Sequence, residues 1–335
     1  MLNAMFLSKA GKGLIDQVYD AETQKMLNER LHFLDGLYQQ DAWKERREDC
    51  AQVEVLFSTW GMHPFTAEEL ATYFPRLKAV FYGAGSVQFF ARSCFERGVR
   101  VFSAAAANAV PVAEFTAAQI VLAGKGYFQA TAQYSRGEHD PGRAHSNRSH
   151  GNYHVPVGII GAGMIGKLVI KLLRAYALPV MVFDPFLPPE KAEELGVTLC
   201  DLPTLFEQCQ VISNHLAINA QTKGMLNYDL FARMKPNATF INTGRGAQVV
   251  EADLVRALTE QPDRTALLDV TEPEPVEAGH PFFTMPNVFL SPHIAGSMNN
   301  ENARMGLYMA QELDRFLQDQ PLQYEVTAEM LATMA

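Results

Sequence analysis

Cysteine is scarce in this chain, and so are long apolar runs. The 335 residues include four cysteines, at positions 50, 94, 200 and 209, and no two of them are spaced as C-x-x-C. Neither a zinc site nor a disulfide framework is indicated by such spacing, so we expect buried thiols, a reducing compartment and no metal site. No stretch approaches the roughly 18 apolar residues of a membrane span, and the first ten residues lack the apolar region of a signal peptide. These absences predict a cytoplasmic protein.

Positive charge is also in short supply. The chain has 28 Lys and Arg against 37 Asp and Glu, which gives a net charge of -9. Because surfaces that bind nucleic acids or anionic membranes are normally basic, we expect neither partner. The hydrophobic content of 48% is that of a globular protein, and a chain of this length is long for a single core. We therefore expect two domains.

What the chain does contain is a glycine-rich stretch near its middle. Residues 157–166 read Val-Gly-Ile-Ile-Gly-Ala-Gly-Met-Ile-Gly, an apolar run followed by three spaced glycines. We predict a strand-turn-helix in which Gly161 permits the tight turn, Gly163 the approach of a pyrophosphate, and Gly166 close helix packing. A second apolar run ends in Asp184, where a carboxylate would bind the adenosine ribose. The pattern favours a dinucleotide site over an ordinary strand-turn-helix with a chance acid.

Short apolar runs alternate with helical patterns along both halves of the chain. In the first half we expect strands at residues 3–7, 53–58, 77–82 and 99–102, and helices at residues 21–28, 66–74 and 88–97. In the second half we expect strands at residues 179–183, 211–214, 239–242, 265–270 and 288–290, and helices at residues 167–176, 251–258 and 299–316. Such alternation predicts two α/β domains with parallel sheets, the second of Rossmann type.

Four segments are harder to interpret. Trp60 could pack in the core or wall a pocket, and packing is the commoner role of an aromatic residue. Residues 83–86, Gly-Ala-Gly-Ser, could bind a carboxylate through exposed N–H groups or form a plain turn. We expect a long helix that starts near Pro111, with this proline in its first turn. Residues 134–150 predict a long polar loop, which we expect on the surface, although contact with a substrate or another subunit is the alternative.

Three polar residues stand just beyond the last three expected strands. They are Arg245, Glu274 and His293. Ligands of open α/β sheets bind beyond the carboxyl ends of the strands. All three side chains could therefore reach the nicotinamide end of a dinucleotide that is held by the glycine loop.

With these motifs in this order, the chain resembles the D-isomer-specific 2-hydroxyacid dehydrogenases over nearly its whole length. The residues that carry the resemblance are the glycine loop with Asp184, the Asn-Thr-Gly-Arg-Gly of residues 242–246, Asp269 with Glu274, and the Ser-Pro-His of residues 291–293. In the first half, residues 83–85 resemble the family's substrate-carboxylate loop and residues 108–114 its interdomain segment.

The resemblance implies a domain organisation. The family has two Rossmann-like or flavodoxin-like α/β domains with parallel sheets, and the cofactor domain is inserted into the substrate domain. We expect a substrate-binding domain of residues 1–117 plus 302–335 and an NAD-binding domain of residues 118–301, with the active site in the cleft between them. A homodimer is implied by resemblance alone.

The resemblance also implies a reaction, the NAD-dependent interconversion of a D-2-hydroxyacid and its 2-oxo acid. Hydride transfer to the 2-oxo acid leaves charge on the carbonyl oxygen, which His293 would protonate as general acid. Glu274 would orient the imidazole and favour its protonated form. Arg245 would bind the substrate carboxylate and the developing oxyanion. The backbone N–H groups of Ala84 and Gly85 would hold the other side of the carboxylate.

A further set of residues is implied to bind the cofactor. Asp184 would bind the ribose hydroxyls and repel a 2′-phosphate, and no Arg or Lys follows within residues 185–189 to offset that repulsion, which favours NAD over NADP. The other expected cofactor contacts are Gly161, Gly163, Met164, Ile165, Gly166, Thr243, Gly244, Asp269 and Gly296.

Two other functions fit the same residues. A corepressor or scaffold that senses NAD(H) uses this fold and can keep all three polar residues, and a dehydrogenase of a non-carboxylate substrate would not need Arg245. Residues 86–90 lack the lysine of phosphite-oxidising relatives, and Glu274 stands where formate-oxidising relatives have glutamine. A 2-oxo acid is therefore the expected substrate class, but the sequence does not predict which one.

Overall fold

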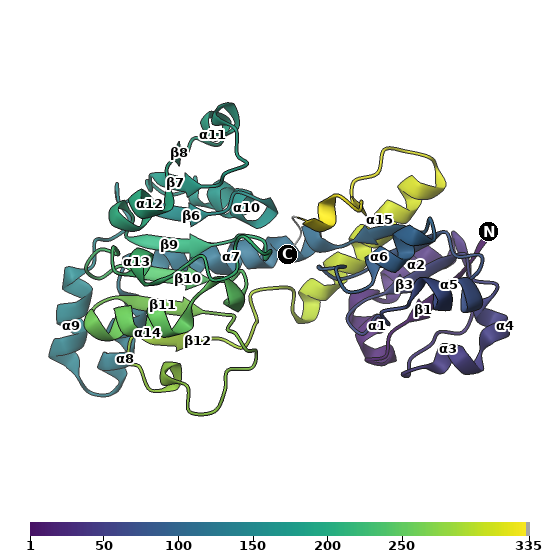
Figure 1. Cartoon of the computed structure of the whole chain (residues 1–335), viewed down its shortest axis with the longest axis horizontal. Coiled ribbons are helices and arrows are strands. Elements are labelled where there is room, and N and C mark those ends of the chain that lie inside the picture. The colour runs from purple at the N-terminus through teal and green to yellow at the C-terminus, as the bar shows by residue number, and fades with distance from the viewer. Residues whose placement is uncertain (333–335) are drawn as a thin grey trace. The chain divides into compact units, whose positions relative to one another are not determined.

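The computed structural model describes residues 1–332, which are divided between two compact units (Figure 1). Within the described residues, unit 1 comprises residues 1–108 and 297–332, and unit 2 comprises residues 109–296. The contacts divide the chain at residues 108 and 297, whereas the expected domain bounds are 117 and 302. The first boundary falls in the opening turn of helix α7 (Ala105–Gly124). The helical pattern continues across this point, so nothing in the sequence marks where the contacts change from one unit to the other.

Unit 1 is built on a six-stranded sheet with the strand order β13-β5-β4-β3-β1-β2. Its strands are β1 (Leu2–Leu7), β2 (Leu31–Phe33), β3 (Val55–Ser58), β4 (Ala79–Tyr82), β5 (Arg100–Ser103) and β13 (Glu325–Val326). Neighbouring strands are parallel except β13, which is antiparallel to β5. The helices are α1 (Lys12–Val18), α2 (Ala21–Asn28), α3 (Ala42–Glu45), α4 (Arg47–Cys50), α5 (Ala67–Tyr73), α6 (Ala91–Glu96) and α15 (Asn302–Leu317).

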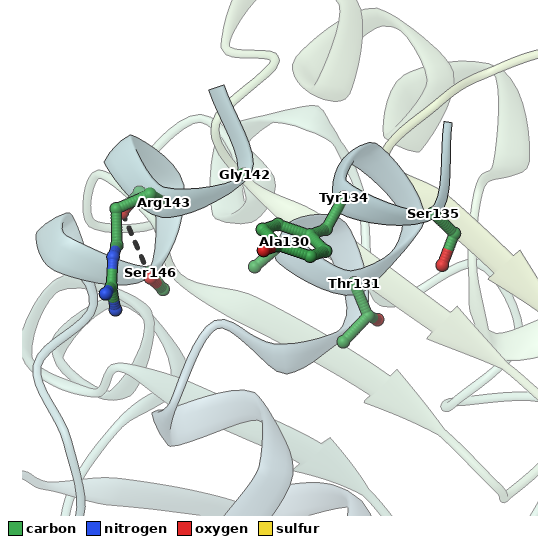
Figure 2. Close-up of a pocket in the computed structure, with 7 residues that line it drawn as sticks. All are labelled: Ala130, Thr131, Tyr134, Ser135, Gly142, Arg143 and Ser146. Carbon is green, nitrogen blue, oxygen red and sulfur yellow. Dashed lines mark hydrogen bonds between the residues drawn. The ribbon is translucent and has the colours of Figure 1, made fainter. Parts of the chain in front are cut away.

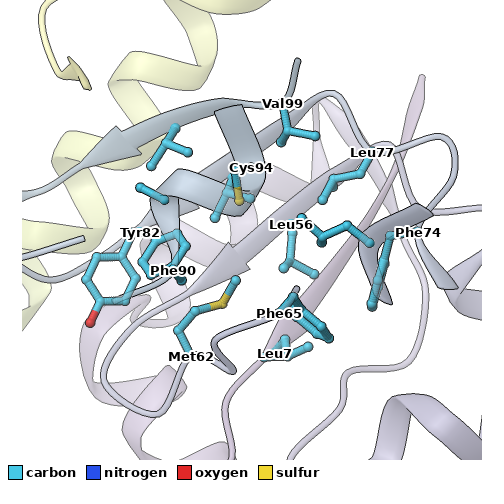
Figure 3. Close-up of a cluster of buried hydrophobic side chains, with 14 of the residues drawn as sticks. Leu7, Leu56, Met62, Phe65, Phe74, Leu77, Tyr82, Phe90, Cys94 and Val99 are labelled. Atoms are coloured by element: carbon cyan, nitrogen blue, oxygen red, sulfur yellow. The ribbon is translucent and has the colours of Figure 1, made fainter. Parts of the chain in front are cut away.

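Apolar clusters cover both faces of this sheet. Successive residues of a strand point to opposite faces, so Leu56 lies in one cluster and Phe57 in the other. Figure 3 shows the first cluster, with Leu56 among aromatic and aliphatic side chains such as Phe65, Phe74 and Leu77, which come from the segments beside helix α5. In the second cluster Phe81 stacks on Phe57 and on Phe102, with ring centroids 5.2 and 4.5 Å apart. Burial on both faces accounts for the continuous apolar runs that predicted these strands.

Trp60 is not part of this core. Its side chain is 37% exposed, whereas Trp43 is 2% exposed and buried in the first cluster. The core packing that we favoured for Trp60 is therefore wrong. Trp60 follows β3 in a loop whose backbone is fixed by a hydrogen bond from the Ser8 hydroxyl to the Trp60 carbonyl oxygen (2.9 Å), and this leaves the indole ring partly open to solvent.

Unit 2 contains a parallel seven-stranded sheet with the order β12-β11-β10-β9-β6-β7-β8. Its strands are β6 (Val157–Ile160), β7 (Val180–Phe183), β8 (Thr198–Leu199), β9 (Val211–Asn214), β10 (Thr239–Asn242), β11 (Thr265–Leu268) and β12 (Val288–Leu290). Besides α7, the helices are α8 (Tyr127–Ser135), α9 (His139–Arg148), α10 (Met164–Leu173), α11 (Pro189–Leu195), α12 (Leu202–Gln208), α13 (Tyr228–Phe231) and α14 (Glu251–Glu260). The two parallel-dominated sheets confirm the predicted fold class. Strand order reverses between β6 and β9, and ligands of such sheets bind near the reversal.

Helix α7 begins earlier than expected. It starts at Ala105, so Pro111 lies inside the helix and not in its first turn. The preceding alanines extend the helix because alanine has the highest helix propensity. By length and mean hydropathy α7 could cross a membrane. Its residues Ala113, Ala117 and Ile120 instead pack in the core of unit 2, which accounts for the apolar composition.

Residues 134–150 are not the long loop that we expected. Helices α8 and α9 form a helical hairpin over most of this range. The prediction failed because α9 buries just Gly142 and His145, too few residues to give an apolar period. A Cβ atom at Gly142 would lie 2.8 Å from the Ala130 carbonyl oxygen. The glycine therefore lets the two helices pack closely.

Candidate active site

The glycine loop joins β6 to α10 in unit 2. Gly161 has a φ of +90°, which residues with a side chain rarely adopt. A Cβ atom at Gly166 would lie 2.0 Å from the Gly161 carbonyl oxygen, so this position has no room for a side chain. A Cβ atom at Gly163 would meet no described atom within 4 Å. The fold itself therefore does not require glycine at 163, whereas the close approach of a pyrophosphate does.

Asp184 lies beside this loop at the end of β7. Its Oδ2 accepts a hydrogen bond from the Ala162 N–H (2.7 Å), and its Oδ1 accepts one from the Phe186 N–H (2.8 Å). Each oxygen keeps a lone pair for a ribose hydroxyl. Helix α10 has no side-chain cap among the described residues, so its first N–H groups are free to bind phosphate. Loop, helix and carboxylate together fit a dinucleotide.

His293 and Glu274 are in direct contact. The His293 Nδ1 lies 2.7 Å from the Glu274 Oε1, and the two side chains are 48% and 43% exposed. Because an ionised carboxylate can only accept, the imidazole donates through Nδ1 and its Nε2 is left for a substrate. The backbone at His293 has a φ of +52°. Its N–H donates to the Asp269 carbonyl oxygen (3.0 Å), which fixes the turn that presents the ring.

Asp269 anchors the loop that carries His293. Its Oδ1 accepts hydrogen bonds from the Ser291 hydroxyl and the Ile294 N–H (3.0 Å), and its Oδ2 accepts one from the Ala295 N–H (2.9 Å). The side chain is buried. We expected Asp269 to contact the carboxamide of the cofactor. Its Oδ2 retains a lone pair that could accept a hydrogen bond from this group, and the contact stays a prediction.

Arg245 follows β10 and is half-buried. Its Nη1 donates to the Gly244 carbonyl oxygen (2.8 Å), and no acceptor in the described part of the chain binds the other N–H groups of the guanidinium. Burial lowers the pKa of the guanidinium, and the negative charge of Glu274 opposes this shift. The preceding Thr243 is hydrogen-bonded through its hydroxyl to that of Thr116 in α7 (3.2 Å). A forked cation with free donors is suited to a carboxylate.

A buried network of side-chain amides supports these loops, and sequence reasoning missed it. The Asn214 Nδ2 donates to the Asn242 Oδ1 (3.0 Å) and to the Gln248 Oε1 (2.6 Å). The Asn242 Nδ2 donates to the Arg245 carbonyl oxygen (3.2 Å), and the Gln248 Nε2 donates to that of Leu216 (2.8 Å). The network ties the loop after β9 to the loop that carries Arg245. An asparagine at the last position of two successive apolar strands is the signal that could have found it.

In unit 1, the loop after β4 has the features of an anion-binding turn. The Thr59 hydroxyl donates to the Gly83 carbonyl oxygen (2.8 Å), and the Ser103 hydroxyl donates to that of Gly85 (2.6 Å). With the carbonyl groups held in this way, the N–H groups of Ala84 and Gly85 have no acceptor within the described residues. Unpaired N–H groups of this kind favour the carboxylate-binding interpretation over a plain turn.

A hollow of about 390 Å³ lies elsewhere in unit 2, between α8 and α9 (Figure 2). Its lining residues are Ala130, Thr131, Tyr134, Ser135, Gly142, Arg143 and Ser146. None of the expected site residues is among them. The hollow is thus separate from the carboxyl ends of the strands, where the motif residues gather.

Unit 2 matches a known family, and curated relatives cover part of the chain. Residues 117–295 match the family model described as D-isomer specific 2-hydroxyacid dehydrogenase, NAD binding domain. The chain is 32% identical over 236 residues to D-3-phosphoglycerate dehydrogenase of Methanocaldococcus jannaschii, covering 70% of this chain and 44% of that protein. It is 34% identical over 171 residues to human glyoxylate reductase/hydroxypyruvate reductase, covering 51% of this chain and 52% of that protein. The chain spans a little under half the length of the phosphoglycerate dehydrogenases that it matches.

Solved structures share the fold along nearly the whole chain. The apo form of D-mandelate dehydrogenase from Rhodotorula graminis has a TM-score of 0.82 at 20% identity, with 97% of each chain covered. D-2-hydroxyisocaproate dehydrogenase has a TM-score of 0.77 at 22% identity, covering 97% of this chain and 100% of that one. The family model matches more than half of the chain, and this protein therefore belongs to the D-isomer specific 2-hydroxyacid dehydrogenase family, with a nicotinamide dinucleotide as its cofactor.

Proposed function

We propose that this protein is an NAD-dependent oxidoreductase that interconverts a D-2-hydroxyacid and its 2-oxo acid. The observation that carries the proposal is the 2.7 Å hydrogen bond between His293 and Glu274, at the carboxyl end of the same sheet that holds the glycine loop. Similarity to phosphoglycerate dehydrogenase and glyoxylate reductase/hydroxypyruvate reductase supports the reaction class.

His293 moves the proton. When bound, the reduced nicotinamide supplies the hydride for the substrate carbon. The His293 Nε2 donates a proton to the carbonyl oxygen of the 2-oxo acid, and in the opposite direction it accepts the hydroxyl proton of the 2-hydroxyacid. Glu274 binds Nδ1, so it fixes the ring orientation and stabilises the imidazolium.

Arg245 binds the acid function of the substrate. Its guanidinium is half-buried, so its attraction to a carboxylate is less screened than in open solvent. The same cation stabilises the negative charge that develops on the carbonyl oxygen. We assign the unpaired N–H groups of Ala84 and Gly85 to the substrate carboxylate as well, in keeping with the donors that an anion-binding turn offers.

Asp184 selects NAD over NADP. Its carboxylate would repel a 2′-phosphate, and no basic residue within positions 185–189 compensates. We further propose a cytoplasmic homodimer, a location in keeping with the four free cysteines. Light scattering on the purified protein checks the dimer, and cell fractionation checks the location.

The test is an assay of NADH oxidation with a panel of 2-oxo acids. We expect turnover of at least one of them by the wild type. We expect His293→Ala to lower kcat by about a hundredfold or more, with an NADH affinity near that of the wild type in a fluorescence titration. Near-wild-type turnover by the variant would exclude His293 as the proton donor. A wild type that binds NADH tightly but reduces no 2-oxo acid would favour the NAD(H) sensor instead.

A further inference from the structure

The loop that carries Glu274 is exposed, and the Glu274–His293 contact does not by itself fix it. The two side chains are 43% and 48% exposed. An ion pair between exposed side chains usually adds little to the stability of a structure. A hydrogen bond of 2.7 Å at this place therefore requires that contacts outside the pair hold the loop.

Glu251, the first residue of α14, contacts this loop on both sides of Glu274. Its Oε1 accepts a hydrogen bond from the Glu272 N–H (2.8 Å), and its Oε2 lies 3.4 Å from the His280 Nε2. The His280 Nδ1 accepts a hydrogen bond from the Phe282 N–H (3.3 Å). A neutral imidazole that accepts at Nδ1 carries its proton on Nε2, the atom that faces Glu251.

Glu251 and His280 are more buried than Glu274 and His293. The side chains of Glu251 and His280 are 13% and 22% exposed. Burial raises the pKa of the Glu251 carboxyl, and the Glu272 N–H and the nearby His280 oppose this shift, while the charge of Glu272 adds to it. A buried acceptor that loses its donor carries an unpaired polar group, so the bonds of Glu251 are costly to break.

The segment before Glu251 also runs against the Glu274 loop. A Cβ atom at Gly246 would lie 2.0 Å from the backbone carbonyl carbon of Thr271. The Thr271 hydroxyl donates to the Pro273 carbonyl oxygen (3.0 Å), which shapes the loop just before Glu274. The chain from Arg245 to Glu251 is therefore in contact with the start of the loop that carries Glu274.

We propose that Glu251 is a positioning residue: it fixes the loop of residues 272–280 so that the Glu274 carboxylate meets the His293 Nδ1. This inference rests on the proposed function, because it assigns Glu251 to the same reaction. We assign Glu251 no contact with the substrate, and it acts through Glu274 alone.

The first test is Glu251→Ala in the full-length protein. We expect kcat to fall about tenfold, on the scale of one positioned hydrogen bond, with the NADH affinity unchanged. We expect the pH profile of kcat to shift, relative to the wild type, in the same direction as the profile of Glu274→Gln. Glu251→Gln keeps an oxygen that can accept from the Glu272 N–H, so it should recover most of the lost activity. Glu260→Ala, at the far end of the same helix, is the matched control and should behave as wild type.

The second test combines Glu251→Ala with Glu274→Gln. If Glu251 acts through Glu274, the double variant should have the kcat of Glu274→Gln alone, because the group to be positioned is already lost. The inference would be overturned if the fold-decrease in kcat of the double variant were the product of the two single decreases. It would also be overturned by a Glu251→Ala variant with the kcat and the pH dependence of the wild type. Thermal unfolding of each variant identifies any that does not fold.

A substitute keeps the inference testable if Glu251→Ala does not fold. His280→Ala removes one of the two contacts that Glu251 makes with the loop of residues 272–280. We expect a smaller loss of kcat with the same shift of its pH profile. A pH profile of kcat equal to that of the wild type contradicts the inference. Failure of the proposed function has a different outcome: wild-type protein that reduces no 2-oxo acid contradicts the reaction, whereas active wild type with an equally active Glu251→Ala variant contradicts the positioning role alone.

Discussion

His215 lies in the loop after β9, where its N–H donates to the carbonyl oxygen of Ile160 (2.7 Å), the residue before Gly161 of the cofactor loop. Burial lowers the pKa of its imidazole to about 3, whereas an exposed histidine titrates at about 6.5. Its Nε2 is 2.9 Å from the Ser213 hydroxyl. Below about pH 6.5 the unfolded chain binds a proton that the native protein does not bind. The stability that neutral His215 contributes is therefore complete above that pH and is lost as the pH falls toward 3.

We predict that His215→Gln reduces the pH dependence of stability. Urea titrations between about pH 7 and pH 5 should show a free energy of unfolding that falls with pH in the wild type and falls less in the variant. His150→Gln, which changes an exposed histidine, should keep the wild-type slope. Equal slopes for wild type and His215→Gln would show that this histidine is not held neutral by the fold.

The proposed preference for NAD over NADP rests on Asp184. We predict that Asp184→Ala lowers the ratio of kcat/KM for NADH to kcat/KM for NADPH, because the variant no longer repels a 2′-phosphate. Steady-state kinetics with both cofactors measures the ratio. Glu190→Ala, an exposed acid in α11, is the control and should leave it unchanged. The same ratio in Asp184→Ala and wild type would exclude this role of Asp184.

At the scale of elements, the hairpin of α8 and α9 depends on a close approach at Gly142. We predict that Gly142→Val destabilises unit 2 by about 1–3 kcal/mol, because the new side chain would overlap the Ala130 carbonyl group. Ala144→Val, on the exposed side of α9, should have a much smaller effect. Urea unfolding measures both, and equal losses would mean that the helices do not pack closely at Gly142.

Elements with two buried faces could be predicted from the sequence, and those with a small buried area could not. The strands β9, β10 and β12 have the bounds that we expected, because parallel strands are buried on both faces and are rich in apolar residues. Helix α9 buries two residues. Its glycine and proline lower its helix propensity, so the helix depends on contact with α8. Propensity and periodicity do not report such tertiary contacts.

The candidate site shows the same division. Arg245, Glu274 and His293 could be predicted because each follows a recognisable strand. Glu251 and Gln248 could not, because their role depends on which backbone N–H and carbonyl groups the loops turn toward them. Residue spacing does not encode these directions. The residues that we propose to meet a substrate were thus visible in the sequence, whereas the residues that we propose to hold them in place were not.

At the scale of the whole molecule, we propose that this chain uses its NAD-binding unit to reduce a 2-oxo acid to the D-2-hydroxyacid. Membership of the 2-hydroxyacid dehydrogenase family supports this reaction. The most direct measurement supplies NADH deuterated at the transferable position together with a 2-oxo acid that the protein turns over, and analyses the product by chiral chromatography and mass spectrometry. The proposed reaction places deuterium on C2 of the D-enantiomer. An L-enantiomer, or a product without deuterium, would contradict it.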